Sequence, residues 1–230
     1  MRKYLVELIG TFFLVFTVCT AVETGAPLAP LAIGGILAAM IFAGGHISGG
    51  HFNPAVTLAV YLRGRIGAID AAWYAGAQLL GGVLAALVTR FVIVNKLEAA
   101  AAPTGRALAA AIVVEVLFTF ALAYTVLNVA TSKSHPVNSF YGLAIGLVVM
   151  AGATAVGGIS GGAFNPAVGL GVLVAGLASW KMLWIYLLAT LLGGALAGYA
   201  FRSLNPDDLA TAGPAADTTA KKVPAGRRPS

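Results

Sequence analysis

The feature that most constrains the fold of this chain is a series of six apolar runs, each about as long as a membrane is thick. A helix needs roughly 20 apolar residues to cross the hydrocarbon core of a bilayer. Charged residues make up only 10% of the 230 residues, against about 25% in soluble domains. A water-soluble fold would lack polar surface, so we expect an all-α, multi-pass integral membrane protein. The six runs are Tyr4–Ala21, Leu28–Gly45, Ala71–Val94, Ala107–Asn128, Phe140–Val156 and Trp180–Phe201.

Two further apolar segments, Asn53–Leu62 and Asn165–Leu177, are too short to span a bilayer. They are interpreted as re-entrant elements that enter the membrane and return. The first long run follows a basic start and could be mistaken for a signal peptide. It is longer than a secretory apolar region and no cleavage site follows it, so we expect it to be retained. It holds the single Cys19, which excludes an intrachain disulfide and favours a buried apolar role.

The Lys and Arg residues are distributed unevenly between the two sides that six spans define. Ten of the fourteen fall on the side of the termini and four on the other side. Since basic loops stay on the cytoplasmic side, both termini are expected in the cytoplasm, and the membrane is expected to be the plasma (inner) membrane. The net charge of +6 is then a topology signal, and no nucleic-acid partner is expected. Residues 203–230 are rich in Pro, Ala, Asp, Thr and Lys and are expected to form a disordered cytoplasmic tail.

Two ten-residue segments that lie 112 positions apart are almost identical. Residues 47–56 read ISGGHFNPAV and residues 159–168 read ISGGAFNPAV, which match at nine of ten positions. The same offset aligns residues 74–85 with residues 186–197 at eight of twelve positions. The domain of residues 1–202 is therefore a duplication, with repeat one at about 1–95 and repeat two at about 107–202. Because each repeat has three spans, the second copy is inverted, and the two short segments enter from opposite faces.

Each short segment begins with Asn-Pro-Ala, as Asn53, Pro54 and Ala55 in repeat one and as their counterparts Asn165, Pro166 and Ala167 in repeat two. Asn is a favoured N-cap, and Pro is tolerated in the first helical turn, so each motif predicts the start of a short helix. A helix N-terminus carries roughly half a positive charge. Two of them that meet at the midplane would repel cations, while the Asn amides orient a passing oxygen and interrupt a proton-conducting chain of waters.

The paired Asn-Pro-Ala motifs resemble those of the aquaporin (major intrinsic protein) family, and the resemblance extends from about Tyr4 to Arg202. The first span carries Glu7 in a Glu-x-x-Gly-Thr pattern, and Glu115 precedes a similar Thr-Phe pair in the fourth span. The resemblance implies an aquaporin-like fold, a homotetramer, and passage of water and small neutral solutes through a bilayer. It also implies that Glu7, Glu115 and His46 support the re-entrant loops.

Backbone carbonyls before each Asn-Pro-Ala motif are expected to line the pore, because glycines there permit an extended backbone. These residues are Gly49, Gly50, His51, Gly161 and Ala163.

The sequence departs from the family pattern at Val168, where most water and glycerol channels have Arg after the second motif. By the family's spacing, the other positions of the selectivity filter fall at Ile33, Ala153 and Gly162. None of the four has a polar side chain. We expect a wide filter without fixed positive charge that discriminates weakly between water and other neutral solutes. The Asp that is typical of glycerol channels near the Arg position is absent as well.

Three other classes of protein were weighed. A coupled transporter needs charged or polar ligands at the midplane, and only Glu7 and Glu115 are available. An enzyme is not expected, since the sequence shows no metal-ligand cluster, nucleophile with base or phosphate loop, and no cofactor or metal is expected. A non-conducting structural membrane protein stays open. Within the channel class, water is expected first, and broad passage of glycerol, ammonia or hydrogen peroxide is the alternative.

Overall fold

A computed structural model describes residues 1–93, 99–136 and 138–209 of the chain. Six long helices in this part of the chain are long and apolar enough to span a membrane, which confirms the predicted spans to within a few residues at each end. They are α1 (Arg2–Glu23), α2 (Ala29–Ser48), α4 (Ala68–Val88), α5 (Gly105–Val126), α6 (Tyr141–Ser160) and α8 (Leu183–Leu204). Short π-helical turns extend α4 through Thr89–Ile93 and α5 through Leu127–Thr131, and the 3-10 turn Trp180–Met182 precedes α8.

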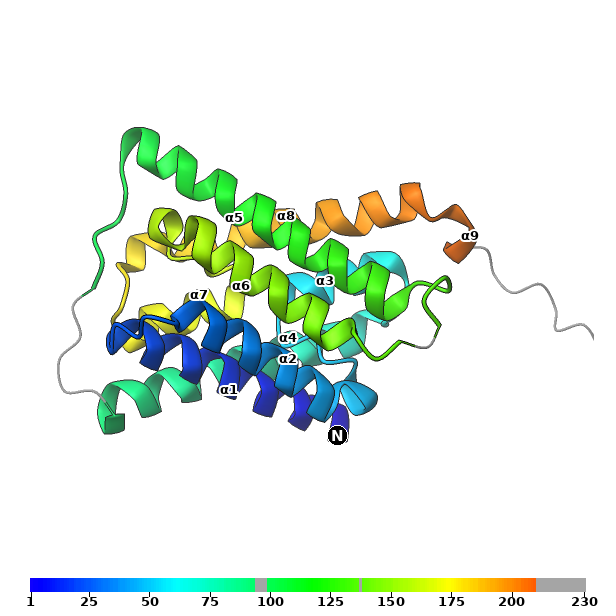
Figure 1. Cartoon of the computed structure of the whole chain (residues 1–230), viewed down its shortest axis with the longest axis horizontal. Coiled ribbons are helices and arrows are strands. Elements are labelled where there is room, and N and C mark those ends of the chain that lie inside the picture. The colour runs from blue at the N-terminus through cyan, green and yellow to red at the C-terminus, as the bar shows by residue number, and fades with distance from the viewer. Residues whose placement is uncertain (94–98, 137, 210–230) are drawn as a thin grey trace, which may run out of the picture.

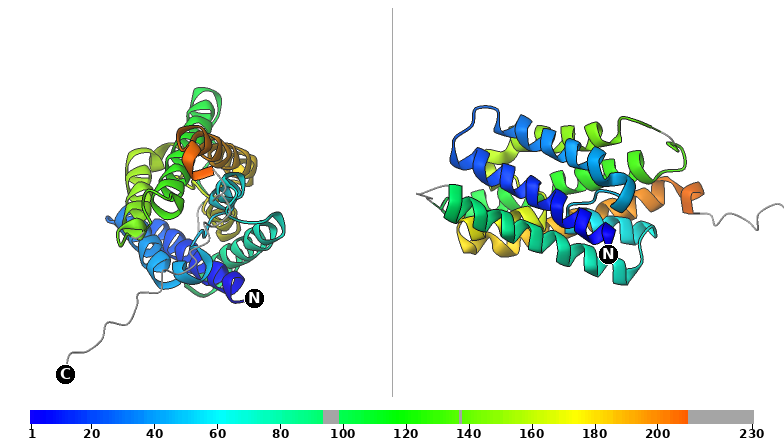
Figure 2. Two further views of the ribbon diagram at one scale, coloured as in Figure 1. Left: turned by 90° about the vertical axis from the view of Figure 1, so that its right-hand side faces the viewer. Right: turned by 90° about the horizontal axis from the view of Figure 1, so that it is seen from below.

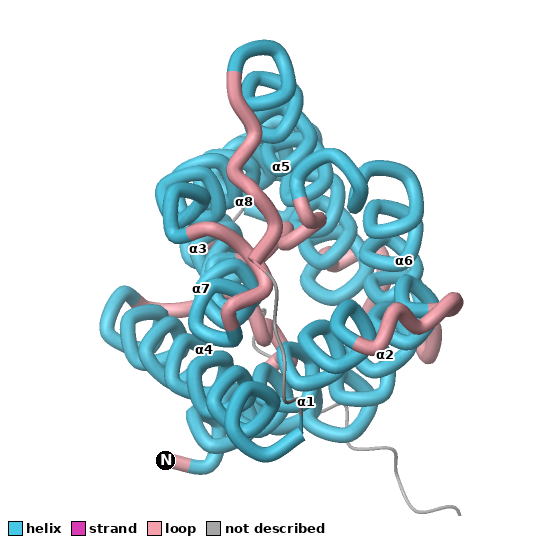
Figure 3. The backbone as a smooth tube through the Cα atoms, turned by 90° about the vertical axis from the view of Figure 1, so that its left-hand side faces the viewer, coloured by secondary structure: helices cyan, strands magenta, loops and turns pink. Residues whose placement is uncertain are grey.

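The two short segments form half-length helices, α3 (Pro54–Arg63) and α7 (Pro166–Ala175). The long helices run side by side, and α3 and α7 lie between them at opposite ends of the bundle, as the cyan and yellow ribbons show (Figure 1). Viewed along the bundle, the long helices form a ring around these half-helices (Figure 3). The right-hand view of Figure 2 places the N-terminus and the C-terminal end of α8 toward the same end of the bundle.

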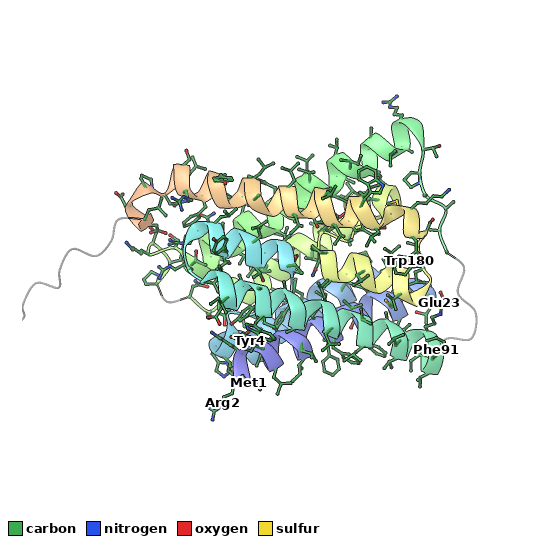
Figure 4. All side chains as sticks on the ribbon, turned by 180° about the vertical axis from the view of Figure 1, so that it is seen from behind. Met1, Arg2, Tyr4, Glu23, Phe91 and Trp180 are labelled. Atoms are coloured by element: carbon green, nitrogen blue, oxygen red, sulfur yellow. The ribbon has the colours of Figure 1, made fainter. Side chains whose placement is uncertain are left out.

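The exposed surface along the bundle carries many large apolar side chains, and polar groups are buried within a mostly apolar interior. Leu5, Trp73 and Leu188 are each more than half exposed, whereas Glu7 and Glu115 are fully buried. Lipid removes the need to hide apolar side chains, while buried carboxylates need partners inside the protein. Met1, Arg2 and Tyr4 lie at one end of the molecule, and Glu23, Phe91 and Trp180 lie at the other (Figure 4). The span α1 therefore runs from one end of the molecule toward the other.

Small residues bring the helices into close contact within one chain. A Cβ built on Gly82 of α4 would lie 2.8 Å from the carbonyl oxygen of Ala167 on α7, and Gly194 of α8 faces the carbonyl of Ala55 on α3 in the same way. Each half-helix is thus seated against a glycine of the opposite repeat. Further close approaches of this kind join α4 to α1, α8 to α5 and α2 to α6, at Gly81, Gly193 and the pair Gly34–Gly146. All of these glycines make their close contacts within one chain.

The sequence predicts a disordered tail from residue 203 onward. This prediction is wrong for residues 203–209. α8 continues to Leu204, and a short helix α9 (Pro206–Leu209) follows it. Asp208 on α9 is buried and pairs with the buried Arg63 of α3 at 3.3 Å. A contact between distant parts of the chain therefore orders a segment whose local composition favours disorder. The rest of the predicted tail, residues 210–230, lies outside the described residues.

Candidate functional site

The two half-helices start in the same way. Asn53 has an extended backbone (φ −159°, ψ 119°), and its side-chain oxygen accepts hydrogen bonds from the backbone N–H groups of Ala55 at 2.8 Å and Val56 at 3.4 Å. Asn165 accepts a hydrogen bond from the backbone N–H of Ala167 at 2.9 Å. The prolines stand in the first helical turn, where the N–H that they lack would have no helical partner. Both asparagines are N-caps that pair otherwise unsatisfied backbone donors.

The same two asparagines hold the re-entrant loops together at the centre of the bundle. Asn53 Nδ2 donates to the carbonyl of Phe164 at 2.9 Å, and Asn165 Nδ2 donates to the carbonyl of Phe52 at 2.9 Å. Each phenylalanine has a left-handed backbone with φ 48°, a conformation that is uncommon for a residue with a side chain. The reciprocal hydrogen bonds fix this conformation and bring the N-termini of α3 and α7 face to face.

Two buried glutamates anchor the loops from the side. The carboxylate of Glu7 accepts hydrogen bonds from the hydroxyl of Ser48 at 2.6 Å and from the backbone N–H groups of His51 at 3.0 Å and Phe52 at 2.6 Å. It also accepts one from the side-chain amide of Gln78 at 2.8 Å. Carboxylates that accept several hydrogen bonds hold the donors firmly, since charge-assisted bonds are about twice as strong as neutral ones.

Glu115 repeats this arrangement in the second half of the chain. It accepts hydrogen bonds from the hydroxyl of Ser160 at 2.7 Å and from the backbone N–H groups of Ala163 at 3.0 Å and Phe164 at 2.8 Å. The structure thus places Glu7 and Glu115 in equivalent contact with the two re-entrant loops. These contacts satisfy two of the most deeply buried charged groups among the described residues.

A cavity of about 260 Å³ lies next to the meeting point of the half-helices. All four residues that the sequence interpretation assigns to the filter, Ile33, Ala153, Gly162 and Val168, belong to its lining. They come from α2, α6, the second loop and α7, so separate parts of the chain converge on one space. Asn53, Asn165, His51, Gly161 and Ala163 also line it. The wall of the cavity around the four filter positions is aliphatic or bare backbone.

A second, wider cavity of about 690 Å³ opens at the end of the bundle where α1 begins and α8 ends. His51 lines both cavities and therefore lies between them, while Gly49 lines only the wider one. Gly50 is buried and is not part of the lining of either cavity. Five residues were expected to present backbone carbonyls to the pore. Four of them line one or both cavities, and Gly50 lines neither.

The supporting role expected of His46 has no contact behind it among the described residues and stays a prediction. His46 lies in the last turn of α2, its side chain is exposed, and among the described residues it has no hydrogen bond or ion pair to the loop. The loop is held instead by Tyr74, whose hydroxyl donates to the carbonyl of Ser48 at 2.8 Å. Tyr186 makes the matching bond to Ser160 at 2.7 Å. The signal was present in the sequence, because both tyrosines open the second aligned segment of the repeat.

Sequence reasoning also missed a polar network around the first loop. Gln78 donates to Glu7 and, at 3.0 Å, to the hydroxyl of Thr57, and that hydroxyl lies 3.1 Å from Nδ1 of His51. Thr57 in turn donates to the carbonyl of Asn53 at 3.0 Å. The network connects the helix cap, the histidine and the glutamate, so the polar wall of the first loop is rigidly built.

The bundle of six spans with two inward half-helices and a cavity between them defines a membrane channel. A sequence profile of the family described as "Major intrinsic protein" matches residues 1–201. The chain belongs to the major intrinsic protein family, and as a member it is a passive small-solute channel and not an enzyme.

Individual relatives agree with this assignment. The chain is 38% identical to "Glycerol uptake facilitator protein-like 6" of Lactiplantibacillus plantarum, over 90% of this chain and 100% of that protein. It is 37% identical to "Probable aquaporin TIP4-1" of Oryza sativa subsp. japonica, over 89% of this chain and 87% of the relative. Its fold is similar to the X-ray structure of the aquaglyceroporin from Plasmodium falciparum, with a TM-score of 0.73 and 21% identity over 90% of this chain and 98% of that chain.

Proposed function

We propose that this protein conducts water together with other small neutral solutes, such as glycerol, ammonia or hydrogen peroxide, and selects only weakly among them. The observation that carries this proposal is the lining of the narrow cavity at Ile33, Ala153, Gly162 and Val168. A solute that passes these four residues meets methyl groups and backbone carbonyls and no side-chain donor. Weak polarity and small side chains favour passage by size and neutrality over recognition of one molecule. The names of the relatives, which include a glycerol facilitator and an aquaporin, agree with this range.

We further propose that protons and other cations are excluded where α3 and α7 meet. Each half-helix is ten residues long and points its N-terminus at the cavity, so each contributes roughly half a positive charge there. A side-chain amide has two N–H donors, and the carbonyls of Phe52 and Phe164 each take one of them from Asn165 and Asn53. The second donor of each amide is then available to a solute oxygen. A water molecule bonded in this way is turned so that protons cannot pass along the row of waters in the pore.

Stopped-flow light scattering on proteoliposomes tests the proposed solute range. The wild type should increase the rates of both water efflux and glycerol uptake over those of empty liposomes. Val168→Arg should reduce glycerol uptake by a larger factor than water flux, because it adds bulk and donors at the filter. Val168→Leu is the matched control that adds bulk without charge.

The outcomes separate the alternatives. An unchanged ratio of glycerol to water permeability in Val168→Arg would show that Val168 does not line the filter. Rates equal to those of empty liposomes would favour a non-conducting structural protein. A pH-sensitive dye inside the same vesicles measures proton flux, and acidification as fast as osmotic shrinkage would refute the midplane barrier.

Assembly and orientation complete the proposal. A homotetramer with both termini in the cytoplasm of a plasma (inner) membrane follows from the family resemblance and from the ten to four division of Lys and Arg. Native mass spectrometry checks the tetramer, and cleavage of a C-terminal epitope by protease added outside intact cells would contradict the orientation.

A further inference from the structure

A third cavity, distinct from the narrow and the wide one, lies at the end of the bundle where α8 ends. Its volume is about 480 Å³, and its charged lining consists of Arg63, Arg65, Lys133, Arg202 and Asp208. We call these five residues the basic pocket. Four cations against one carboxylate give 4 − 1 = +3 in the lining. The exposed Asp207 on α9 is the neighbouring carboxylate, which still leaves an excess of positive charge.

Much of the basic pocket is fixed in place by contacts within the protein. The side chains of Arg63 and Asp208 are 3% and 5% exposed and form an ion pair at 3.3 Å. Arg63 also donates from Nε to the hydroxyl of Thr131 at 3.0 Å and lies 4.8 Å from the centre of the Phe201 ring. The backbone N–H of Lys133 donates to both carboxylate oxygens of Asp208, at 3.1 and 3.2 Å. Asp208 is thus held from two sides, by Arg63 and by the backbone of Lys133.

The two exposed arginines of the basic pocket are held by single backbone contacts. Arg65 donates from one terminal nitrogen to the carbonyl of Thr131 at 3.4 Å, and Arg202 donates from one terminal nitrogen to the carbonyl of Leu62 at 2.8 Å. A guanidinium has five N–H donors in a planar fork, so each arginine keeps donors beyond the one that orients it. Such a fork matches the oxygens of a phosphate group.

The position of the basic pocket relative to the membrane-spanning helices indicates which kind of anion it would bind. Arg202 stands in the last turn of α8, which ends at Leu204, and Arg63 is the last residue of α3. The pocket therefore lies at the depth where the hydrocarbon ends and lipid headgroups begin. Basic pockets at this depth on the cytoplasmic side attract anionic headgroups.

We propose that the basic pocket binds the phosphate of an anionic phospholipid headgroup, with Arg65 and Arg202 as its principal donors. The bound phosphate would lie beside the mouth of the channel, because Arg65 and Lys133 also line the wide cavity of the termini end.

The test is native mass spectrometry of the purified protein titrated with dioleoylphosphatidylglycerol, compared with dioleoylphosphatidylcholine of the same chains. Wild type should retain the anionic lipid in clear preference to the zwitterionic one. The double variant Arg65→Gln/Arg202→Gln should weaken anionic-lipid retention about tenfold. The double variant Arg2→Gln/Arg106→Gln, which removes two exposed arginines outside the pocket, should bind as wild type does. Arg65→Lys/Arg202→Lys keeps the charge but loses the planar fork, so its binding should fall between that of wild type and that of the Gln pair.

Three results would overturn the proposal. The first is retention of the anionic lipid by the Gln pair at wild-type strength. The second is an equal loss in the Arg2/Arg106 control, which would indicate a diffuse surface effect. The third is competition by inorganic phosphate at equal concentration, which would identify a site for free anions and not for lipid. A Gln pair that unfolds in detergent at the wild-type temperature shows that its loss of lipid is not caused by unfolding.

Discussion

The seat of α7 against α4 gives the sharpest test of how packing positions the channel. In Gly82→Ala the new Cβ would lie 2.8 Å from the carbonyl oxygen of Ala167, where ordinary contact begins at 3.4 Å. The difference, 3.4 − 2.8 = 0.6 Å, must be taken up by movement of α4 or of the half-helix, because the obstacle is backbone. Overpacking of this kind costs about 1–3 kcal/mol. Part of the cost is offset because Ala exceeds Gly in helix propensity by about 0.8–1.0 kcal/mol.

Gly76→Ala is the matched control on the same helix. No atom lies within 4 Å of a Cβ built on Gly76, and the residue is exposed. This control gains the propensity term alone, so the difference in unfolding free energy between the two variants isolates the packing cost of about 1–3 kcal/mol. Thermal unfolding in detergent measures the difference, and water permeability of proteoliposomes measures displacement of the Asn165 motif. If Gly82→Ala were as stable and as permeable as Gly76→Ala, the tight seat of α7 would be refuted.

The remaining predictions concern the narrow cavity, the glutamates that anchor the loops, and the Arg63–Asp208 ion pair that holds α9, which we call the latch. Cys19 is fully buried, so thiol reagents should leave wild-type water flux unchanged, whereas Ala153→Cys should become sensitive to them in the same swelling assay. Persistent flux in labelled Ala153→Cys would contradict its place in the pore. Glu7→Gln replaces an acceptor of four hydrogen bonds and should lower the free energy of unfolding by at least about 2 kcal/mol, measured by thermal unfolding in detergent. A variant as stable as wild type would refute that anchoring role. Asp208→Asn leaves Arg63 buried without its carboxylate, and breaking a buried pair costs about 3–5 kcal/mol. Amide hydrogen exchange around Lys133 should therefore rise in Asp208→Asn but not in the exposed control Asp207→Asn, and equal rates in both would refute the latch.

The sequence predicted the elements of the fold well because two strong periodic signals agree. Apolar length defined the spans, and the repeat at an offset of 112 defined the two half-helices together with their caps at Asn53 and Asn165. The length of an apolar run is a local property, and the repeat is found by comparing the chain with itself, so neither signal requires knowledge of long-range contacts. The spacing of the family motifs also selected Ile33 and Ala153, which lie on separate helices and share one cavity lining.

What the sequence could not predict depends on contacts between distant residues. α9 is four residues long and forms where Asp208 meets Arg63, 145 positions earlier; nothing in the composition of residues 203–209 indicates that partner. The prediction that His46 supports the loop meets a related difficulty. It directly precedes the loop in sequence, but helical geometry turns its side chain outward, and the hydroxyl of Tyr74 reaches the loop from another helix.

The two halves of the channel are equivalent in backbone but not in polarity, and this difference bears on where solutes are selected. In repeat one, Thr57, Gln78 and His51 form a connected polar network. Their counterparts at the offset of 112 are Gly169, Thr190 and Ala163. A side chain at Gly169 would collide with Tyr186, so the second half has no room for the threonine that organises the first.

A solute on the side of the termini can therefore exchange water for the donors of His51 and Asn53, which line the cavity. Under the proposed function, the solute then passes Val168, Ile33 and Ala153, which line the cavity and offer no polar side chain. Loss of hydration is compensated only by backbone carbonyls there, and an uncompensated polar group is costly. The dehydration barrier should thus be concentrated at Val168 and not at the midplane, since the midplane supplies two amides. For that reason changes at Val168 should alter which neutral solutes pass, while changes at the asparagines should alter whether charge passes.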